Sequence, residues 1–202
     1  MRVIVIGGTG TIGSAVVKLF STRHEVVAVG HKGGTFQVDL ASPDSITSLF
    51  KAVGTCDAVV STAGIAKFAS LDDLTYDDYF IGLKNKLMGQ ANLVRIGRPF
   101  VTNHGSFTLT SGVLSQNPMK GSASISMVNA GLEGFVRAAA IDLPRGLRVN
   151  VVSPPWVTET LIARGMDPSI GIPADQVAQA YLASVEGTMT GQTLDPRHIT
   201  AV

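Results

Sequence analysis

Apolar runs alternate along the chain with segments in which apolar residues recur at helical spacing. The first run, Val3 to Ile6, is rich in β-branched residues and leads into a glycine-rich turn. A short continuous apolar run is typical of a buried strand, and a period of about 3.6 residues is typical of a helix. The pattern predicts strands over residues 3–6, 26–29, 36–38, 57–61, 106–110, 147–152 and 192–194. It predicts helices over residues 12–20, 42–53, 72–97 with a break near Thr75, 122–143 and 173–186.

Fully apolar strands that alternate with helices indicate a parallel sheet with both faces covered. The chain contains no linker, low-complexity segment or internal repeat, and its 202 residues suit one domain. We therefore expect a single domain over residues 1–202, a doubly wound α/β fold with a parallel sheet, that is, a Rossmann fold.

The composition narrows the class of protein. Apolar residues make up 45% of the chain and charged residues 15%, which excludes a disordered chain. The net charge of +1 argues against nucleic acid or an anionic membrane as a partner. Cys56 is the one cysteine, so an internal disulfide is excluded. No two histidines have metal-ligand spacing, so we expect no metal site.

No apolar stretch suggests export or a membrane span. Only four apolar residues separate Arg2 from Gly7, too few for the core of a signal peptide. No stretch approaches the roughly 20 apolar residues that a membrane span needs. We expect a cytoplasmic protein without a membrane partner.

A glycine motif, G-x-x-G-x-x-G, lies between the first strand and the first helix. Glycines there allow a tight turn and the close approach of a pyrophosphate to the start of the helix, whose N–H groups attract anions. The alternative is an ordinary tight turn, but the position in the first βαβ unit favours dinucleotide binding. The predicted contact residues are Gly7, Thr9, Gly10, Thr11, Ile12 and Gly13.

The end of the second strand favours NADP(H) over NAD. NAD sites usually carry an acidic residue about 20 residues beyond the glycines. Here the strand ends in Gly30-His31-Lys32, with no carboxylate between Val26 and Val38. Lys32 can attract a 2′-phosphate and His31 can donate to it. The alternatives are that Lys32 is only a solvated loop charge, and that the cofactor is NAD.

Four further motifs follow in order: Asp39-Leu40, Ser61–Gly64, Phe107–Gly112 and Leu147–Thr158. With the glycine turn, they make the chain resemble the short-chain dehydrogenase/reductase family over essentially its whole length. In that family the first of these four motifs contacts adenine, and the second follows the fourth strand. The third delivers the catalytic serine, and the fourth binds nicotinamide. The resemblance implies these further cofactor-binding residues: Asp39, Leu40, Thr62, Ala63, Gly64, Asn129, Pro154, Val157 and Thr158.

The catalytic positions depart from the family pattern. The family's helical Tyr-x-x-x-Lys pair corresponds to Ile125 and Asn129, and the asparagine of its fourth position corresponds to Lys86. Isoleucine has no proton to give, and asparagine supplies a hydrogen bond but no charge. The resemblance therefore leaves Ser111, Lys86 and Asn129 as the candidate catalytic residues. Lys86 has a plain alternative, a surface lysine in a basic run.

Two functions remain open. The first is an NADP(H)-dependent oxidoreductase with a degenerate site that acts on a small carbonyl or alcohol. The second is a non-catalytic dinucleotide-binding redox sensor or regulatory protein. The resemblance also implies a homodimer or homotetramer formed by helices around residues 78–97 and 121–142. Small or apolar side chains available for that contact, or for burial within one chain, are Ala123, Met127, Ala130, Phe135 and Ala139.

Overall fold

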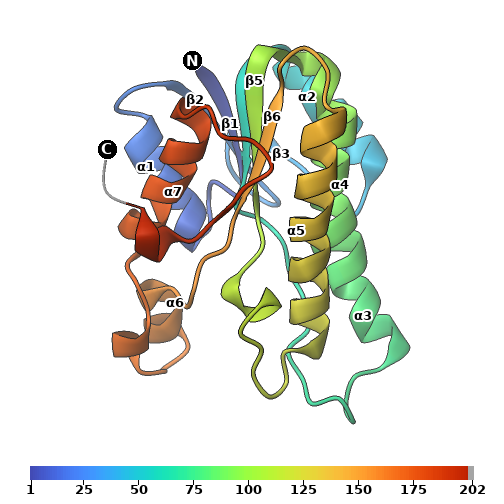
Figure 1. The fold of residues 1–202 in the computed structure, drawn as a ribbon, viewed down its shortest axis with the longest axis vertical. Helices are drawn as coiled ribbons and strands as arrows, with labels where there is room; N and C mark the ends of the chain where they lie inside the picture. Colours follow the sequence, from blue (N-terminus) through green and yellow to red (C-terminus); the bar gives the residue numbers. More distant parts are fainter. Residues whose placement is uncertain (200–202) are drawn as a thin grey trace.

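A seven-stranded parallel sheet forms the centre of the protein (Figure 1). The computed structural model describes residues 1–199. The strand order is β3-β2-β1-β4-β5-β6-β7, so the direction of strand addition reverses between β1 and β4. The strands are β1 Arg2–Ile6, β2 Glu25–Gly30, β3 Phe36–Gln37, β4 Cys56–Ser61, β5 Val101–Thr110, β6 Arg148–Val152 and β7 Thr193–Leu194. The predicted doubly wound fold is confirmed.

Helices cover both faces of the sheet. In Figure 1, α1 and α7 lie on one side, and α2, α3, α4 and α5 lie on the other. Each side has its own core, because the strands alternate side chains between the two faces. The helices are α1 Thr11–Phe20, α2 Pro43–Val53, α3 Tyr76–Gly82, α4 Gly89–Gly97, α5 Ala123–Asp142, α6 Thr158–Ala163 and α7 Ala174–Glu186.

The starts of α2 and α3 are capped by side chains. The Ser42 hydroxyl accepts from the Ser45 N–H at 3.2 Å, and Pro43 occupies the first helical position of α2. The predicted break near Thr75 is the true start of α3. There Thr75 and Asp78 form a capping box, in which each side chain bonds the other residue's backbone. The long helical stretch therefore begins at Tyr76 rather than at residue 72.

Three local features differ from the prediction. A π-helical segment, Leu83–Met88, joins α3 to α4 and carries Lys86. β5 begins at Val101 rather than at residue 106, because an irregularity in its pairing with β4 accommodates the Asn- and Gly-containing segment. Helix α6 was not predicted; it is too short to show a helical period.

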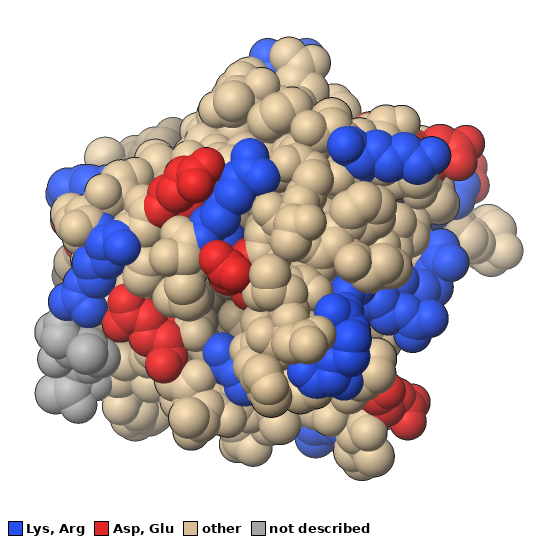
Figure 2. All heavy atoms as spheres, turned by 90° about the horizontal axis from the view of Figure 1, so that it is seen from above, with Lys and Arg blue, Asp and Glu red and all other residues tan. Residues whose placement is uncertain are grey.

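The surface carries charges of both signs. Figure 2 views the edge of the sheet opposite the carboxyl ends of the strands, and there blue and red side chains are interspersed over uncharged surface. That face offers no continuous basic track of the kind that follows a nucleic-acid backbone. Among residues 1–199, no helix is both long and apolar enough to cross a membrane.

Candidate active site

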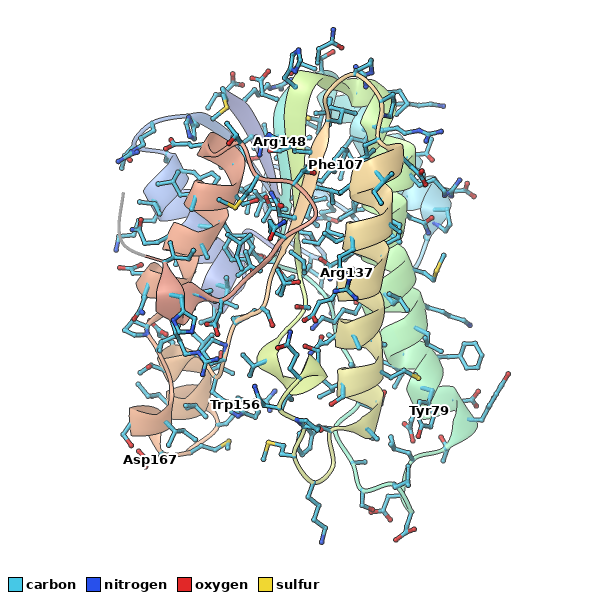
Figure 3. All side chains as sticks on the ribbon, viewed as in Figure 1. Tyr79, Phe107, Arg137, Arg148, Trp156 and Asp167 are labelled. Carbon is cyan, nitrogen blue, oxygen red and sulfur yellow. The ribbon has the colours of Figure 1, made fainter. Side chains whose placement is uncertain are left out.

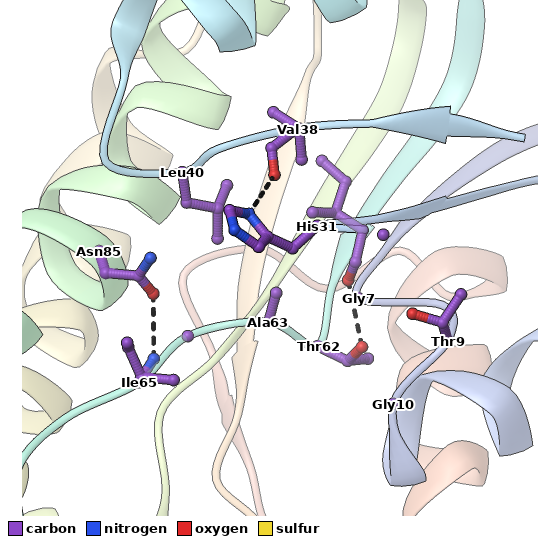
Figure 4. A pocket seen from close by; sticks show the side chains of 13 residues that line it. Gly7, Thr9, Gly10, His31, Val38, Leu40, Thr62, Ala63, Ile65 and Asn85 are labelled. Carbon is purple, nitrogen blue, oxygen red and sulfur yellow. Dashed lines mark hydrogen bonds between the residues drawn. The ribbon is translucent and has the colours of Figure 1, made fainter. Parts of the chain in front are cut away.

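A cavity of about 360 Å³ lies at the carboxyl ends of β1, β2 and β4 (Figure 4). Parallel sheets bind ligands at this edge, where the strand order reverses. Eight predicted cofactor residues line it: Gly7, Thr9, Gly10, His31, Leu40, Thr62, Ala63 and Gly64. Five further lining residues were not predicted: Ile6, Gly30, Val38, Ile65 and Asn85. Their position beside predicted residues was the signal that could have found them.

The glycines of the turn have two different roles: some allow close packing of the backbone, and one leaves space for a ligand. Gly7 has φ +82°, and a Cβ at Gly13 would overlap the carbonyl oxygen of Gly7. Both positions therefore exclude side chains for reasons internal to the fold. A Cβ at Gly10 would meet only the Gly7 oxygen, at 3.4 Å, so this glycine leaves open space toward the cavity.

The start of α1 is suited to an anion. Its N-cap is Gly10, no side chain caps it, and no acidic residue lies in the first turn. Thr11, Ile12 and Gly13 form that first turn and do not line the cavity with their side chains. The first N–H groups of a helix carry partial positive charge and need partners. A phosphate group in the cavity would satisfy them.

The β2 end supplies basic rather than acidic side chains. His31 lines the cavity, and its Nδ1 lies 3.4 Å from the carbonyl oxygen of Val38. Lys32 is exposed and lies outside the cavity wall. Asp39 also lies outside it, and its carboxylate accepts from the Ala41 N–H at 2.9 Å, while Leu40 lines the wall. The described lining residues include no carboxylate.

The loop after β4 connects the cavity to Lys86. The Thr62 hydroxyl donates to the Ile6 carbonyl at 3.1 Å, which fixes the loop against β1. Asn85 Oδ1 accepts from the Ile65 N–H at 3.0 Å. A Cβ at Gly64 would lie 2.7 Å from Cγ of Lys86, so the stem of that lysine passes directly beside this glycine.

Lys86 and Asn129 meet at the end of β5. Lys86 Nζ donates to the carbonyl oxygen of Ser111 at 2.8 Å. Asn129 Nδ2 donates to the next carbonyl, that of Gly112, at 3.2 Å. Asn129 Oδ1 is buried and has no hydrogen-bond partner within the protein. Burial lowers the pKa of Lys86 to about 8. The structure therefore brings two of the candidate catalytic side chains to one place.

The Ser111 hydroxyl is engaged elsewhere. Ser111 is 3% exposed, and its Oγ donates to Glu133 Oε1 at 3.0 Å. Glu133, on α5, is 5% exposed and was not predicted as a site residue. It stands four residues after Asn129, so both share one helix face, and that spacing was the available signal. Ser111 thus faces the candidate site with its carbonyl oxygen.

No tyrosine among the described residues takes the place of Ile125. Tyr181 is fully buried, and its hydroxyl lies 2.6 Å from the Thr110 hydroxyl. Burial raises the pKa of Tyr181, so it holds its proton firmly. Tyr76 is 78% exposed, and Tyr79 lies on α3 in the outer helix layer (Figure 3).

The predicted nicotinamide loop follows β6 at the same edge. Pro154 is buried, and its carbonyl accepts from the Val113 N–H at 3.1 Å. Val157 is buried and forms a bridge to Ile172, and the Thr158 N–H donates to the Ile172 carbonyl at 2.9 Å. Figure 3 shows Trp156 on this loop, between β6 and α6. The three predicted cofactor residues of this loop, Pro154, Val157 and Thr158, lie outside the 360 Å³ cavity.

The comparisons with known proteins agree with this geometry. The family model described as Enoyl-(Acyl carrier protein) reductase matches residues 14–194. Short-chain dehydrogenase/reductase ATR9 of Stachybotrys chlorohalonatus is 28% identical over 95% of this chain and 93% of its own length. The 3-oxoacyl-[acyl-carrier-protein] reductase MabA of Mycobacterium avium is 28% identical over 93% of this chain and 80% of its own.

Solved structures show the same fold. The crystal structure of the protein lin1944 from Listeria innocua is 37% identical, with a TM-score of 0.93, and the match covers 96% of this chain and 98% of that one. A small-chain dehydrogenase in complex with NADPH has a TM-score of 0.85 at 24% identity, over 96% of this chain and 95% of that one. The ordered motifs, the sheet topology and the matched length lead to one conclusion: this chain belongs to the short-chain dehydrogenase/reductase family, whose members are oxidoreductases that bind a nicotinamide dinucleotide.

Proposed function

We propose that this protein is an NADP(H)-dependent oxidoreductase that acts on a small carbonyl or alcohol. The observation that carries the proposal is the cavity between the uncapped start of α1 and the basic end of β2. A carboxylate there would repel a 2′-phosphate, and His31 and Lys32 would attract it. The NADPH held by a small-chain dehydrogenase of the same fold supports this choice.

The residues present fit such a cofactor. Gly10 leaves space where a side chain would obstruct a pyrophosphate, and the first turn of α1 offers unpaired N–H groups. Leu40 and Ala63 give apolar walls suited to adenine. Asn129 Oδ1, buried without a partner, would accept from a ribose hydroxyl. When bound, the nicotinamide supplies or accepts the hydride.

Lys86 is the proton donor in this proposal. The stem of its side chain lies beside the loop after β4, and its ammonium group donates to the Ser111 carbonyl oxygen at 2.8 Å. A pKa of about 8 lets the group hold its proton at neutral pH and still release it to an oxyanion. The role of Ser111 is to orient the ammonium group of Lys86 through its backbone carbonyl. Asn129 binds the neighbouring carbonyl and leaves the positive charge to Lys86.

A non-catalytic dinucleotide-binding sensor is the second candidate. It is favoured by Ile125 at the family's tyrosine position and by the commitment of the Ser111 hydroxyl to Glu133. A general acid typically contributes about 10²–10⁴-fold to the rate, so its loss would leave little turnover.

One experiment separates the two candidates. NADPH and NADH binding is titrated by the fluorescence of the reduced nicotinamide, and NADPH oxidation is then followed over a panel of small aldehydes and ketones. Turnover supports the oxidoreductase. Tight NADPH binding without turnover supports the sensor, and absence of binding to either nucleotide would overturn both.

The assembly is proposed to be a homodimer or homotetramer. A groove of about 420 Å³ runs between α4 and α5, and Met88, Ala91 and Phe135 contribute apolar walls to it. Ala123, Met127 and Ala130 are exposed on α5, while Phe135 and Ala139 are half-buried. Such a face is typical of helix–helix contacts between subunits.

A further inference from the structure

We propose that Glu133 is a positioning residue that sets the place of Lys86 and Asn129 at the end of β5. This inference rests on the proposed function, because Lys86 and Asn129 are its proton donor and ribose ligand. Glu133 lies behind both, on the face of α5 that carries Asn129. Within residues 1–199 no side-chain hydrogen bond joins its carboxylate to Lys86 or Asn129, and it acts through the backbone carbonyls that they bind.

The carboxylate of Glu133 joins three separate segments. Oε1 accepts from Ser111 at 3.0 Å, from Ser115 at 2.6 Å and from Ser153 at 3.5 Å. Oε2 accepts from Gln116 Nε2 at 3.4 Å. These donors belong to the end of β5, to the 3-10 turn at Val113–Ser115 with the residue after it, and to the end of β6.

The chemistry of this cluster is unusual for a packing role. Glu133 is 5% exposed, and within residues 1–199 no other acidic or basic residue is buried to this degree. No basic side chain in the described part of the chain forms an ion pair with it. A buried carboxylate costs free energy unless hydrogen bonds compensate it, and four donors converge here to do so.

The position of Ser111 connects this cluster to the site. Its hydroxyl is held by Glu133, and its carbonyl accepts from Lys86. The carbonyl oxygen of the next residue, Gly112, accepts from Asn129 and lies 3.0 Å from the hydroxyl oxygen of Ser115, whose one proton is donated to Glu133 at 2.6 Å. A shift of the carboxylate would therefore move both carbonyls that place the ammonium and amide groups.

The two halves of the site allow a selective test. The glycine turn, His31 and Leu40 follow β1, β2 and β3, whereas the side chains of Lys86 and Asn129 meet the backbone after β5. Adenosine 2′,5′-bisphosphate would occupy only the first half, while NADPH would span both, because a dinucleotide lies across the point where the strand order reverses. Damage confined to the β5 end should weaken NADPH binding and spare the fragment.

The experiment compares Glu133→Gln with Glu186→Gln, a control at the end of α7 whose carboxylate binds Arg23. Glutamine keeps the shape but turns one acceptor into a donor facing Gln116. We expect Glu133→Gln to weaken NADPH binding, to lower kcat about 10²-fold by misplacement, and to leave affinity for adenosine 2′,5′-bisphosphate at the wild-type value. The control should change none of these three quantities.

Several outcomes would overturn the inference without touching the proposed function. One is a Glu133→Gln protein with wild-type kcat and NADPH affinity, and another is an equal loss of both affinities. If the variant does not fold, Ser115→Ala removes the 2.6 Å bond and keeps the carboxylate. It should show the same selective loss in milder form, and a wild-type result for it would contradict the inference. Failure of the wild-type protein to bind NADPH would instead overturn the proposed function.

Discussion

Lys86 and Asn129 donate to successive backbone carbonyls, those of Ser111 and Gly112, at 2.8 and 3.2 Å. In the correspondence with the family that we propose, asparagine stands at the first of these positions and lysine at the second, so this chain would carry the same two residue types in exchanged positions. Lys86 lies in the π-helical segment Leu83–Met88, and from there its Nζ reaches the carbonyl of Ser111 after β5. A single positive charge is thus kept at the site, delivered from the neighbouring helix.

The glycine turn gives a matched pair of substitutions. Gly13→Ala would press a methyl group against the Gly7 carbonyl and should lower the free energy of unfolding by about 1–3 kcal/mol. Gly10→Ala meets only one atom, at 3.4 Å, and should fold normally while losing NADPH affinity. Thermal denaturation and NADPH titration of both variants check this. A Gly10→Ala protein with wild-type affinity would show that no phosphate approaches this turn.

Lys32 should select NADPH over NADH. Because Lys32 is exposed, its contribution to a 2′-phosphate is screened and amounts to at most about 1 kcal/mol, roughly fivefold in affinity. Lys32→Ala should therefore weaken NADPH binding about fivefold and leave NADH binding nearly unchanged. Lys51→Ala, at an exposed lysine in the last turn of α2, is the control. Equal losses of affinity for NADPH and NADH would mean that Lys32 does not bind the 2′-phosphate.

Lys86 should give carbonyl reduction a pH dependence. Burial lowers the pKa of Lys86 to about 8, so the proton-donating form predominates below that pH and is lost above it. The rate of carbonyl reduction should be level below pH 8 and fall above it. Lys86→Arg keeps a charge but releases no proton, and should lower kcat about 10²–10⁴-fold while NADPH still binds. A Lys86→Arg enzyme of undiminished kcat would remove Lys86 from the proton path.

The α4–α5 face should form the subunit contact. Ala130 is exposed there on α5, and an arginine in its place would bring charge and bulk into a close helix–helix contact. Ala130→Arg should dissociate the assembly, and Ala52→Arg, on the exposed side of α2, should not. Light scattering at micromolar concentration measures both. A wild-type monomer would contradict the proposed assembly.

The sequence predicted the fold and most of the residues that line the cavity at β1 and β2, because both depend on local signals. A glycine-rich turn, a β-branched strand and a serine followed by proline each favour one backbone conformation through residues adjacent in sequence. Glu133 carries no such signal, since its burial depends on Ser111, Ser115 and Ser153, which lie 18 to 22 residues away in sequence. Long-range contacts of this kind become visible only in the folded chain.

The π-helical segment was missed for a related reason. Its residues, Leu-Lys-Asn-Lys-Leu-Met, are ordinary helix formers, and nothing in their period distinguishes a π turn from an α turn. The early start of β5 was hidden as well, because the residues at 103–105 are typical of a loop.

The last prediction restores the family's active site in three changes. Ile125→Tyr with Asn129→Lys would place the tyrosine and lysine one helical turn apart on the α5 face that meets the end of β5. With Lys86 still present, two ammonium groups would compete for adjacent carbonyls, and like charges this close destabilise each other. The double variant should therefore gain little. Adding Lys86→Asn removes the repulsion and also the proton donor of the unchanged protein. The triple variant should therefore exceed the single variant Lys86→Asn in carbonyl reduction by up to about 10²–10⁴-fold, the usual contribution of a general acid. In the present structure the Ser111 hydroxyl donates to Glu133. Ser111→Ala in the triple variant tests whether this hydroxyl takes part in the reaction, and a loss of activity would show that it turns toward the substrate. If the triple variant folds, binds NADPH and is no more active than Lys86→Asn on any carbonyl of the panel, then the restored tyrosine does not act as the acid, and the loop that carries Pro155 and Trp156 becomes the part to alter next.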